Sequence, residues 1–221
     1  MLETVQPGAT TPAGPRPNAG RVLLCAAAAL AAVTAMVVLT GSLGPLDRWC
    51  TGLFRHVPTG GPVHAAVVVV TWSGSIGVGV TILILFGVLL SWRRRAAGPV
   101  LATSAVTLAL AASVYGLKAW VGRARPGVPV GTDPEPAFPS GHAATATVVA
   151  GTVLALLWWT VLREHRRIAG CLAAGYVVAV GVSRLYLGVH WLSDVLAGWL
   201  VGIALVSALL LCLTRWPRAT R

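Results

Sequence analysis

A histidine and an aspartate lie four residues apart in SRLYLGVHWLSD, residues 183–194 of an otherwise apolar chain. This spacing predicts that the side chains of His190 and Asp194 share one face of a helix. The carboxylate can then hold one ring nitrogen of His190 protonated and leave the lone pair of the other nitrogen as a nucleophile. A second histidine, His142, could donate a proton to a leaving alkoxide. Around a cluster of cations, two such histidines would indicate phosphoryl transfer through a phosphohistidine.

Three cations accompany the histidines, namely Lys118, Arg125 and Arg184. In a half-buried setting they would repel one another unless an anion lay between them, and the planar arginine fork suits phosphate oxygens. The segment FPSGHA adds a predicted helix start, with Ser140 as its N-cap and Gly141 open to a ligand. Because helix N-termini bind anions, we predict a phosphate cradle that needs no metal.

Several of these residues also have a plainer interpretation. Lys118 and Arg123 could be side chains at a helix end that reach the membrane interface, and Ser140 could be only a structural N-cap. His190 and Asp194 could form an interfacial hydrogen bond or bind a metal, although the nearby cations would repel a metal ion. Arg123 could do no more than add charge to its face of the protein.

The chain that must position these side chains has the composition of a membrane protein. Of its 221 residues, 56% are hydrophobic and 10% are charged, whereas a soluble domain has about 25% charged residues. In a membrane protein, an excess of basic residues such as the net charge of +11 usually sets the orientation in the membrane and binds anionic lipid headgroups. No basic patch interleaved with aromatic residues suggests nucleic acid, so the expected partner is the lipid bilayer.

Six apolar runs each reach the length of about 20 residues that a helix needs to cross a bilayer. They cover about 22–43, 63–90, 99–120, 141–162, 168–187 and 191–213. The second run is longer than necessary and contains TWSGSIGVG, so we expect a kink, a tilt or an interfacial turn there. We predict an all-α, polytopic membrane protein with a bundle of six transmembrane helices at 21–215, a disordered tail at 1–20 and a basic tail at 216–221.

Basic residues outside the runs predict the orientation, because cytoplasmic loops are rich in Lys and Arg. They occupy alternate loops and both tails: Arg16, Arg21, Arg93, Arg94, Arg95, Arg163, Arg166, Arg167, Arg215, Arg218 and Arg221. We therefore expect both termini on the cytoplasmic side of the cell membrane and the loops 44–62, 121–140 and 188–190 outside. The first run could instead be a signal peptide, and the five later runs would keep the same orientation. The candidate site residues then share one outer layer, and His165 lies on the opposite side.

Three motifs in this layer resemble those of the type 2 phosphatidic acid phosphatase superfamily. KAWVGRARP, residues 118–126, resembles its K-x6-RP motif, and PSGH, residues 139–142, is similar to its second motif. Residues 183–194 resemble its third motif, SR-x5-H-x3-D. PSGH alone is a short string, but three motifs in this order on one membrane face are specific. The likeness extends over about 22–213.

The resemblance implies a role for each motif residue and an enzyme without a metal or organic cofactor. His190 would be the nucleophile, Asp194 its orienting partner and His142 the general acid. The residues that would bind the phosphate are Lys118, Arg125, Ser140, Gly141 and Arg184.

The membrane branch of that family dephosphorylates lipid phosphates and diphosphates, so the resemblance implies a lipid phosphatase acting on the outer face of the membrane. Polyprenyl diphosphate is the expected substrate, and phosphatidate and phosphatidylglycerophosphate are alternatives. A lipid phosphotransferase would use the same residues. A transporter or a structural membrane protein is the alternative outside enzymes, although transporter sites usually lie at the bilayer midplane.

The loop 44–62 is expected to help lipids reach the site. Its candidate side chains are Trp49, Phe54, Arg55 and His56. His56 and His64 are expected near the membrane interface, where either could touch a substrate headgroup.

Overall fold

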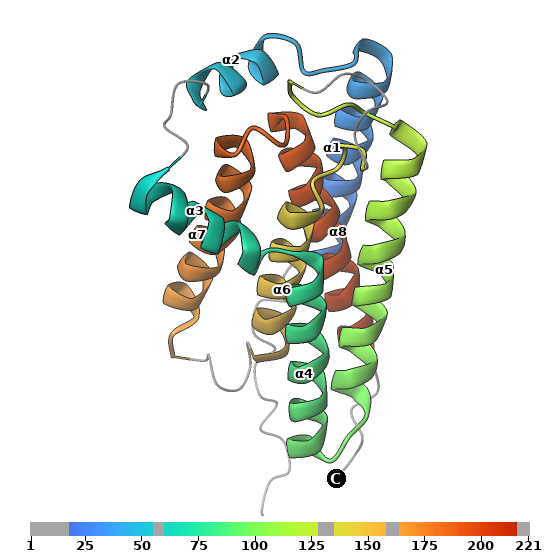
Figure 1. Cartoon of the computed structure of the whole chain (residues 1–221). Coiled ribbons are helices and arrows are strands. Elements are labelled where there is room, and N and C mark those ends of the chain that lie inside the picture. Colours follow the sequence, from blue (N-terminus) through green and yellow to red (C-terminus); the bar gives the residue numbers. More distant parts are fainter. Residues whose placement is uncertain (1–17, 55–59, 128–134, 158–163, 216–221) are drawn as a thin grey trace, which may run out of the picture.

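The structure, a computed structural model, describes residues 18–54, 60–127, 135–157 and 164–215, and over these residues all regular secondary structure is helical (Figure 1). The helices are α1 (Ala19–Thr40), α2 (Pro45–Phe54), α3 (Gly61–Ser73), α4 (Ile76–Arg94), α5 (Gly98–Val121), α6 (Gly141–Leu157), α7 (Arg166–Tyr186) and α8 (Leu192–Arg215). The predicted all-α fold is confirmed. Apart from residues 18–20, the tails predicted at 1–20 and 216–221 lie outside the described residues.

Five of the described helices are long and apolar enough to cross a membrane, namely α1, α4, α5, α7 and α8. Helix α6 is also apolar but is described only to Leu157, short of the predicted end of its run at residue 162. Large apolar side chains such as Leu39, Trp92 and Leu108 point outward, as contact with lipid requires. The chain is a multi-pass membrane protein, and six is an approximate count of its spans.

The second predicted run is broken into α3 and α4 at Gly74 and Ser75, which confirms the expected kink. Ser75 caps α4, since its hydroxyl accepts a hydrogen bond from the N–H of Val78 at 3.4 Å. A Cβ at Gly74 would lie 2.5 Å from Cγ1 of Val180 on α7, so a side chain there would force α7 away. Because the helix is broken at this point, α3 diverges from the line of α4. It packs against α7, and Gly74 allows the close contact with Val180 (Figure 1).

Helix α8 is the central element, and it packs against α1, α5 and α6. Its contact with α6 is a contact between backbones, because glycines face the partner helix. A Cβ added at Gly198 would lie 2.5 Å from the carbonyl oxygen of Ser140, and one at Gly202 would overlap Cβ of Thr147. Small residues four apart allow such close approach between helices in lipid, so α6 and α8 are held at a fixed distance.

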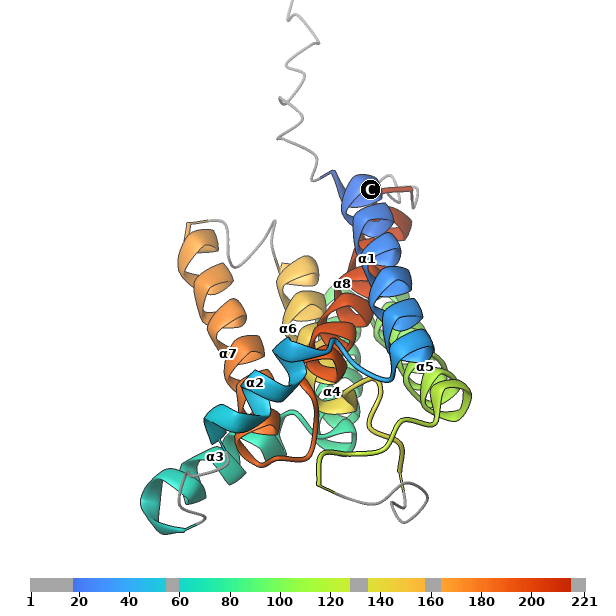
Figure 2. The same cartoon turned by 90° about the horizontal axis from the view of Figure 1, so that it is seen from above.

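Four helix ends meet at one end of the bundle: the C-terminal ends of α5 and α7 and the N-terminal ends of α6 and α8 (Figure 1). Helix α2 lies across this end and contacts α7 and α8 (Figure 2). The C-terminal end of α4 and the turn to α5 lie at the opposite end (Figure 1), and they carry Arg93, Arg94 and Arg95. The predicted site layer and this arginine-rich loop are therefore separated by the length of the bundle.

Candidate active site

His190 lies in the turn between α7 and α8, and Asp194 lies in the first turn of α8. Their side chains are 3% and 0% exposed, and Nδ1 of His190 is 3.4 Å from Oδ2 of Asp194. This is ion-pair distance rather than the geometry of a formed hydrogen bond. Since α8 begins only at Leu192, the two residues do not share a regular helix face as predicted, but the turn still brings them together. The N–H of Trp191 donates to Oδ2 of Asp194 at 2.8 Å and holds the carboxylate in place.

Burial lowers the pKa of His190, because an imidazolium is costly to desolvate. The carboxylate of Asp194 opposes this change, and the positive charges of Arg184 and Arg125 add to it. Overall the pKa of His190 is lowered, which favours the neutral imidazole. A neutral ring that keeps its proton on the nitrogen facing Asp194 has its other nitrogen free of a proton, as a nucleophile requires.

The segment PSGH connects the loop after α5 to the start of α6. Ser140 is fully buried, and its N–H donates to the carbonyl oxygen of Asp194 at 2.9 Å. Its hydroxyl lies 3.5 Å from the N–H of Ala143, at the long limit of an N-cap hydrogen bond. A Cβ at Gly141 would lie 3.2 Å from Cδ1 of Ile76, so this position is tight on the side of α4. The N-terminus of α6 is thus fixed beside the N-terminus of α8.

The three predicted cations come from three different segments around these two helix starts. Lys118, buried in the last turn of α5, donates to the carbonyl oxygen of Pro136 and lies 3.6 Å from the carboxylate of Glu135. Arg125 donates from Nε to the carbonyl of Glu135 at 3.1 Å and from a terminal nitrogen to the carbonyl of Val189 at 3.2 Å. Arg125 therefore links the loop after α5 to the turn that carries His190.

Arg184 projects from the last turn of α7 and is largely buried. One terminal nitrogen donates to the hydroxyl of Thr71 on α3 at 2.7 Å. Its Nε is buried and has no hydrogen-bond partner among the described residues. A buried guanidinium donor without a partner is unfavourable by about 1–3 kcal/mol, so this nitrogen favours a ligand with an acceptor oxygen.

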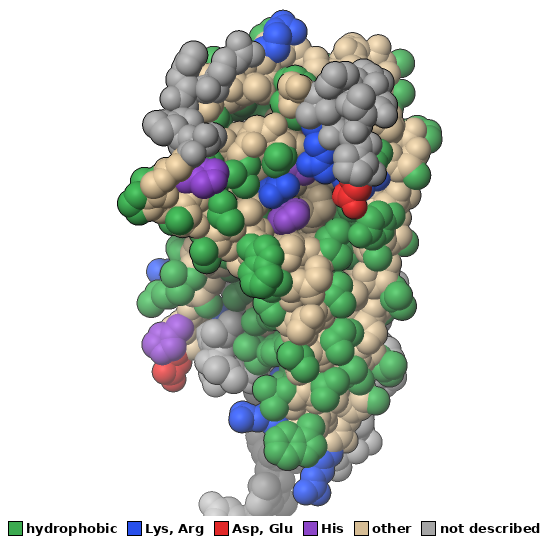
Figure 3. All heavy atoms as spheres, viewed as in Figure 1, with side chains coloured by type: hydrophobic (Ala, Val, Ile, Leu, Met, Phe, Trp, Pro, Cys, Tyr) green, Lys and Arg blue, Asp and Glu red, His purple; other side chains and the backbone are tan. Residues whose placement is uncertain are grey.

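The predicted site residues come together in the folded chain. His142 on α6 is close enough to interact electrostatically with Lys118, Arg125, Arg184 and His190. Figure 3 shows Lys, Arg and His side chains gathered near the end of the bundle that carries α2, above a surface of hydrophobic side chains. This arrangement can hold an anion among cations and close to two imidazoles.

The sequence did not reveal the role of two further charged residues of this region, Arg123 and Asp47. Arg123 is 9% exposed and donates to Oδ1 of Asp194 at 2.5 Å and to Oδ2 of Asp47 at 2.8 Å. The sequence left the role of Arg123 open, and its burial between two carboxylates shows that it does more than add charge to the surface. Asp47 is fully buried in α2, part of the segment that was predicted to be a loop. The only available signal for Asp47 was that acidic residues are rare in this chain, which has 6 Asp and Glu among 221 residues.

Asp47 binds the N-terminus of α8 as well as Arg123. Oδ1 accepts a hydrogen bond from the N–H of Ser193 at 2.9 Å, and Oδ2 accepts one from the hydroxyl of Ser193 at 2.7 Å. Burial alone would raise the pKa of Asp47, but the hydrogen bonds from Arg123, Ser193 and the N–H of Leu43 together lower it. Asp47 therefore stays ionised in the folded protein.

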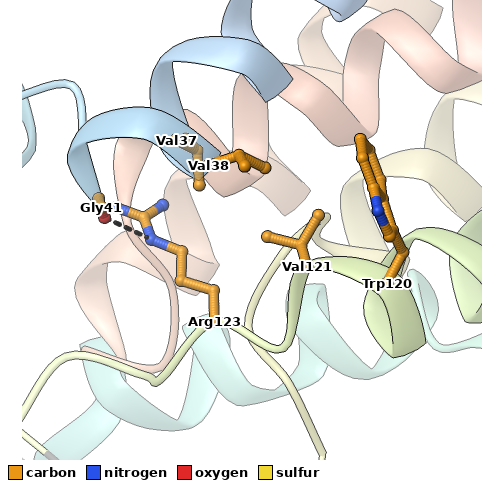
Figure 4. A pocket seen from close by; sticks show the side chains of 6 residues that line it. All are labelled: Val37, Val38, Gly41, Trp120, Val121 and Arg123. Atoms are coloured by element: carbon orange, nitrogen blue, oxygen red, sulfur yellow. Dashed lines mark hydrogen bonds between the residues drawn. The ribbon is translucent and has the colours of Figure 1, made fainter.

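An open groove lies between the ends of α1 and α5 (Figure 4). It is lined by Val37, Val38, Gly41, Trp120, Val121 and Arg123. Nε of Arg123 donates to the carbonyl of Gly41 at 3.1 Å across it. None of the predicted site residues lines this groove, and Arg123 connects it to Asp194.

The segment 44–62 forms α2 and then continues to α3. The ring of Phe54 meets that of Tyr186 edge-on at 6.2 Å, and the ring of His64 lies 6.1 Å from the same tyrosine. This places Phe54 and His64 against the end of α7 that carries Arg184. Arg55 and His56 lie outside the described residues.

Curated relatives share parts of this sequence. The chain is 37% identical over 92 residues to phosphatidylglycerophosphatase B of Bacillus subtilis, a match that covers 40% of the chain and 45% of the relative. It is 40% identical over 75 residues to an undecaprenyl-diphosphatase of Sulfolobus acidocaldarius, with 32% of each protein covered. The matched segments thus span less than half the length of these relatives.

Solved structures share the fold over a larger part of the chain. A crystal structure of a transmembrane PAP2-type phosphatidylglycerolphosphate phosphatase from Bacillus subtilis superposes with a TM-score of 0.75. The match has 22% identity and covers 90% of this chain and 98% of the other. LpxE of Aquifex aeolicus superposes with a TM-score of 0.53 at the same identity, over 73% of this chain and 92% of the other.

At the level of the family, residues 96–218 match the PAP2 superfamily. This range contains all three sequence motifs and the predicted site residues, from Lys118 to Asp194. The match extends over more than half of the 221 residues, and the chain belongs to the PAP2 superfamily.

Proposed function

We propose that this protein is an integral-membrane lipid phosphatase that hydrolyses a phosphomonoester or diphosphate of a lipid. The observation that carries the proposal is the buried Nε of Arg184, which lacks a partner among the described residues in a site that also contains Lys118 and Arg125. A phosphate group would satisfy that donor and offset the repulsion between the cations. Ser140 and the N–H of Gly141 at the start of α6 would bind further phosphate oxygens.

In the first step His190 attacks phosphorus. The Nδ1–H is held toward Asp194, and the lone pair of Nε2 forms the N–P bond. At the same time the bond between that phosphorus and the leaving oxygen breaks; this oxygen is the ester oxygen of a phosphomonoester or the bridging oxygen of a diphosphate. His142 gives its proton to the leaving oxygen, so the lipid departs as an alcohol, or as a monophosphate from a diphosphate. A phosphate bound among Lys118, Arg125 and Arg184 offsets their charge, which allows His142 to carry that proton.

In the second step water hydrolyses the phosphohistidine. The water oxygen forms a bond to phosphorus, its proton passes to His142, and the electrons of the N–P bond return to His190. Inorganic phosphate is released and both histidines return to their starting states. No step requires a metal, because the cations of the site stabilise the charge on the phosphate oxygens.

The position of the site at one end of the bundle suits a substrate whose phosphate lies at the membrane surface. Arg93, Arg94 and Arg95 lie at the other end, and basic residues favour the cytoplasmic side. We therefore propose that the active site lies on the extracytoplasmic face of the cell membrane and that both termini are cytoplasmic. The names of the relatives favour phosphatidylglycerophosphate and undecaprenyl diphosphate as substrates. We rank polyprenyl diphosphate first.

A phosphate-release assay on the purified full chain in phospholipid nanodiscs tests the proposal. The panel comprises polyprenyl diphosphate, phosphatidylglycerophosphate, phosphatidate and a soluble sugar phosphate, each with and without EDTA. Release from at least one lipid, unaffected by EDTA and abolished in His190→Ala, is expected. Turnover of the sugar phosphate alone, or full activity in His190→Ala, would contradict it.

A further inference from the structure

A buried ionic cluster connects α2 to the acid that faces His190. Its members are Asp47 on α2, Arg123 after α5, and Ser193 and Asp194 at the start of α8. Asp47, Ser193 and Asp194 are fully buried, and Arg123 is 9% exposed. Arg123 lies between the two carboxylates, at 2.8 Å from Asp47 and 2.5 Å from Asp194.

The guanidinium of Arg123 is fixed on several sides. Besides the two carboxylates, it donates to the hydroxyl of Ser193 at 2.5 Å and to the carbonyl of Gly41 at 3.1 Å. Its Cζ also lies 5.3 Å from the ring centroid of Trp191, within the range of a cation–π contact. A group held this tightly can fix the position of Asp194, whose other oxygen faces His190.

The charges of the cluster matter as much as its geometry. Arg123 contributes one positive charge, and Asp47 and Asp194 contribute one negative charge each. The sum is one negative charge, which matches the positive charge that the ring of His190 gains when it bonds to phosphorus. Without Asp47, Arg123 would neutralise Asp194 and leave nothing to balance that ring.

We propose that Asp47 and Arg123 are positioning residues for the reaction at His190. Arg123 holds Asp194 in place, and Asp47 balances the charge of Arg123 so that the carboxylate of Asp194 remains available to His190. The inference rests on the proposed function, since it assigns to His190 the role of nucleophile. It also extends the site beyond the three sequence motifs, to a helix that precedes the matched range 96–218.

Other charged and titratable groups act on His190 and must be left unchanged in the test. They are Arg184 on α7, Arg125 in the loop after α5, His142 on α6, and Lys118 and Glu135, which interact with each other at the edge of the site. A substitution within the cluster changes the electrostatic potential at His190 and leaves these groups in place.

The test is a double-mutant cycle in which each substitution removes one charge from the cluster. The variants are Asp47→Asn, Arg123→Gln and the double variant Asp47→Asn/Arg123→Gln. Removal of the negative charge in Asp47→Asn lowers the pKa of His190, and removal of the positive charge in Arg123→Gln raises it, by about half a unit to one unit each. The double variant keeps the net charge of the cluster, so its His190 titrates close to wild type. A merely structural contact would not produce opposite shifts that cancel.

Two readouts separate this inference from the proposed function. The first is ¹⁵N NMR of the histidine-labelled full chain in nanodiscs, with the His190 signal assigned by its loss in His190→Gln. The second is lipid phosphate release, in which Asp47→Asn lowers kcat about tenfold and leaves KM within about twofold, because the charged intermediate loses stabilisation. If the wild type releases no phosphate, the proposed function fails, whereas the NMR cycle still tests the electrostatic coupling.

Identical titration of His190 in all variants, or shifts of the same sign in both single variants, would overturn the inference. If Asp47→Asn does not fold, Arg123→Lys takes its place, because it keeps the charge and loses the planar fork. In Arg123→Lys, His190 titrates as in wild type while kcat falls. If the pKa of His190 in Arg123→Lys shifted as far as in Arg123→Gln, the positive charge at position 123 would not be what controls the titration of His190.

Discussion

The main-chain N–H of Ser140 donates a hydrogen bond to the main-chain carbonyl of Asp194 at 2.9 Å. This bond joins the loop that begins α6 to the first turn of α8, across 54 residues of sequence. It places the predicted phosphate-binding segment PSGH next to the carboxylate that faces His190. A main-chain hydrogen bond therefore fixes the position of the phosphate site relative to the nucleophile. This position depends on how closely α6 and α8 approach each other.

Gly198→Ala tests that dependence. An added Cβ would lie 2.5 Å from the carbonyl oxygen of Ser140 and 3.0 Å from Cβ of Ala143, so α6 must move away from α8. We expect a destabilisation of about 1–3 kcal/mol and a loss of phosphate release. Gly175→Ala on α7 is the matched control, since nothing lies within 4 Å of its added Cβ. Thermal unfolding in detergent measures both, and equal stability of the two variants would contradict the packing argument.

Arg184→Ala should weaken catalysis more than removal of its protein partner does. Loss of the guanidinium removes a donor to the charged phosphate, and kcat/KM is expected to fall about 10²–10³-fold. Thr71→Ala removes only the hydroxyl that accepts from Arg184 at 2.7 Å, with an expected loss of about tenfold or less. Steady-state phosphate release compares them. An Arg184→Ala enzyme no weaker than Thr71→Ala would argue against the phosphate cradle.

His142→Ala should distinguish between leaving groups. A lipid alkoxide needs a proton when it leaves, so turnover of a phosphomonoester lipid, phosphatidate or phosphatidylglycerophosphate, is expected to fall about 10²–10⁴-fold. p-Nitrophenolate leaves without a proton, so hydrolysis of p-nitrophenyl phosphate should fall far less. His165→Ala is the control, because His165 is exposed and precedes α7 at the end opposite the site. Equal losses with both substrates would remove the general-acid role.

The pH dependence should reflect the buried position of His190. Protonated His190 cannot attack phosphorus, and burial lowers its pKa below the ordinary value of about 6.5. As the pH falls, activity is thus retained through pH 6.5 and is lost only when the pH reaches the lowered pKa. The acid limb of kcat/KM against pH measures this. A midpoint at or above pH 6.5 would mean that His190 is more accessible to water than the structure shows.

The helices and motif residues were predictable because the bilayer and the chemistry each restrict the sequence strongly. A membrane span must be a long apolar run, and the runs in the sequence predicted the bounds of α1, α5, α7 and α8 to within a few residues of those observed. Lys118, Arg125, Arg184 and the two histidines were noticeable because ionisable groups are rare within and next to such runs.

Asp47 and Arg123 could not be found in the same way. Asp47 is 147 positions before Asp194, in a short helix whose sequence is not apolar enough to suggest a buried position. Arg123 had an adequate explanation as a basic residue at a helix end, and only the fold shows that it lies between two carboxylates. Pairings between distant segments depend on helix packing, which periodicity and composition do not determine.

Covalent bonding of His190 to phosphorus can be detected by rapid quenching of the reaction with ³²P-labelled lipid substrate. A protein-bound label that is stable to base and labile to acid is expected, located by peptide mapping at His190. The label should be absent in His190→Ala. Phosphate release without any such intermediate, or label on His190→Ala protein, would contradict the account.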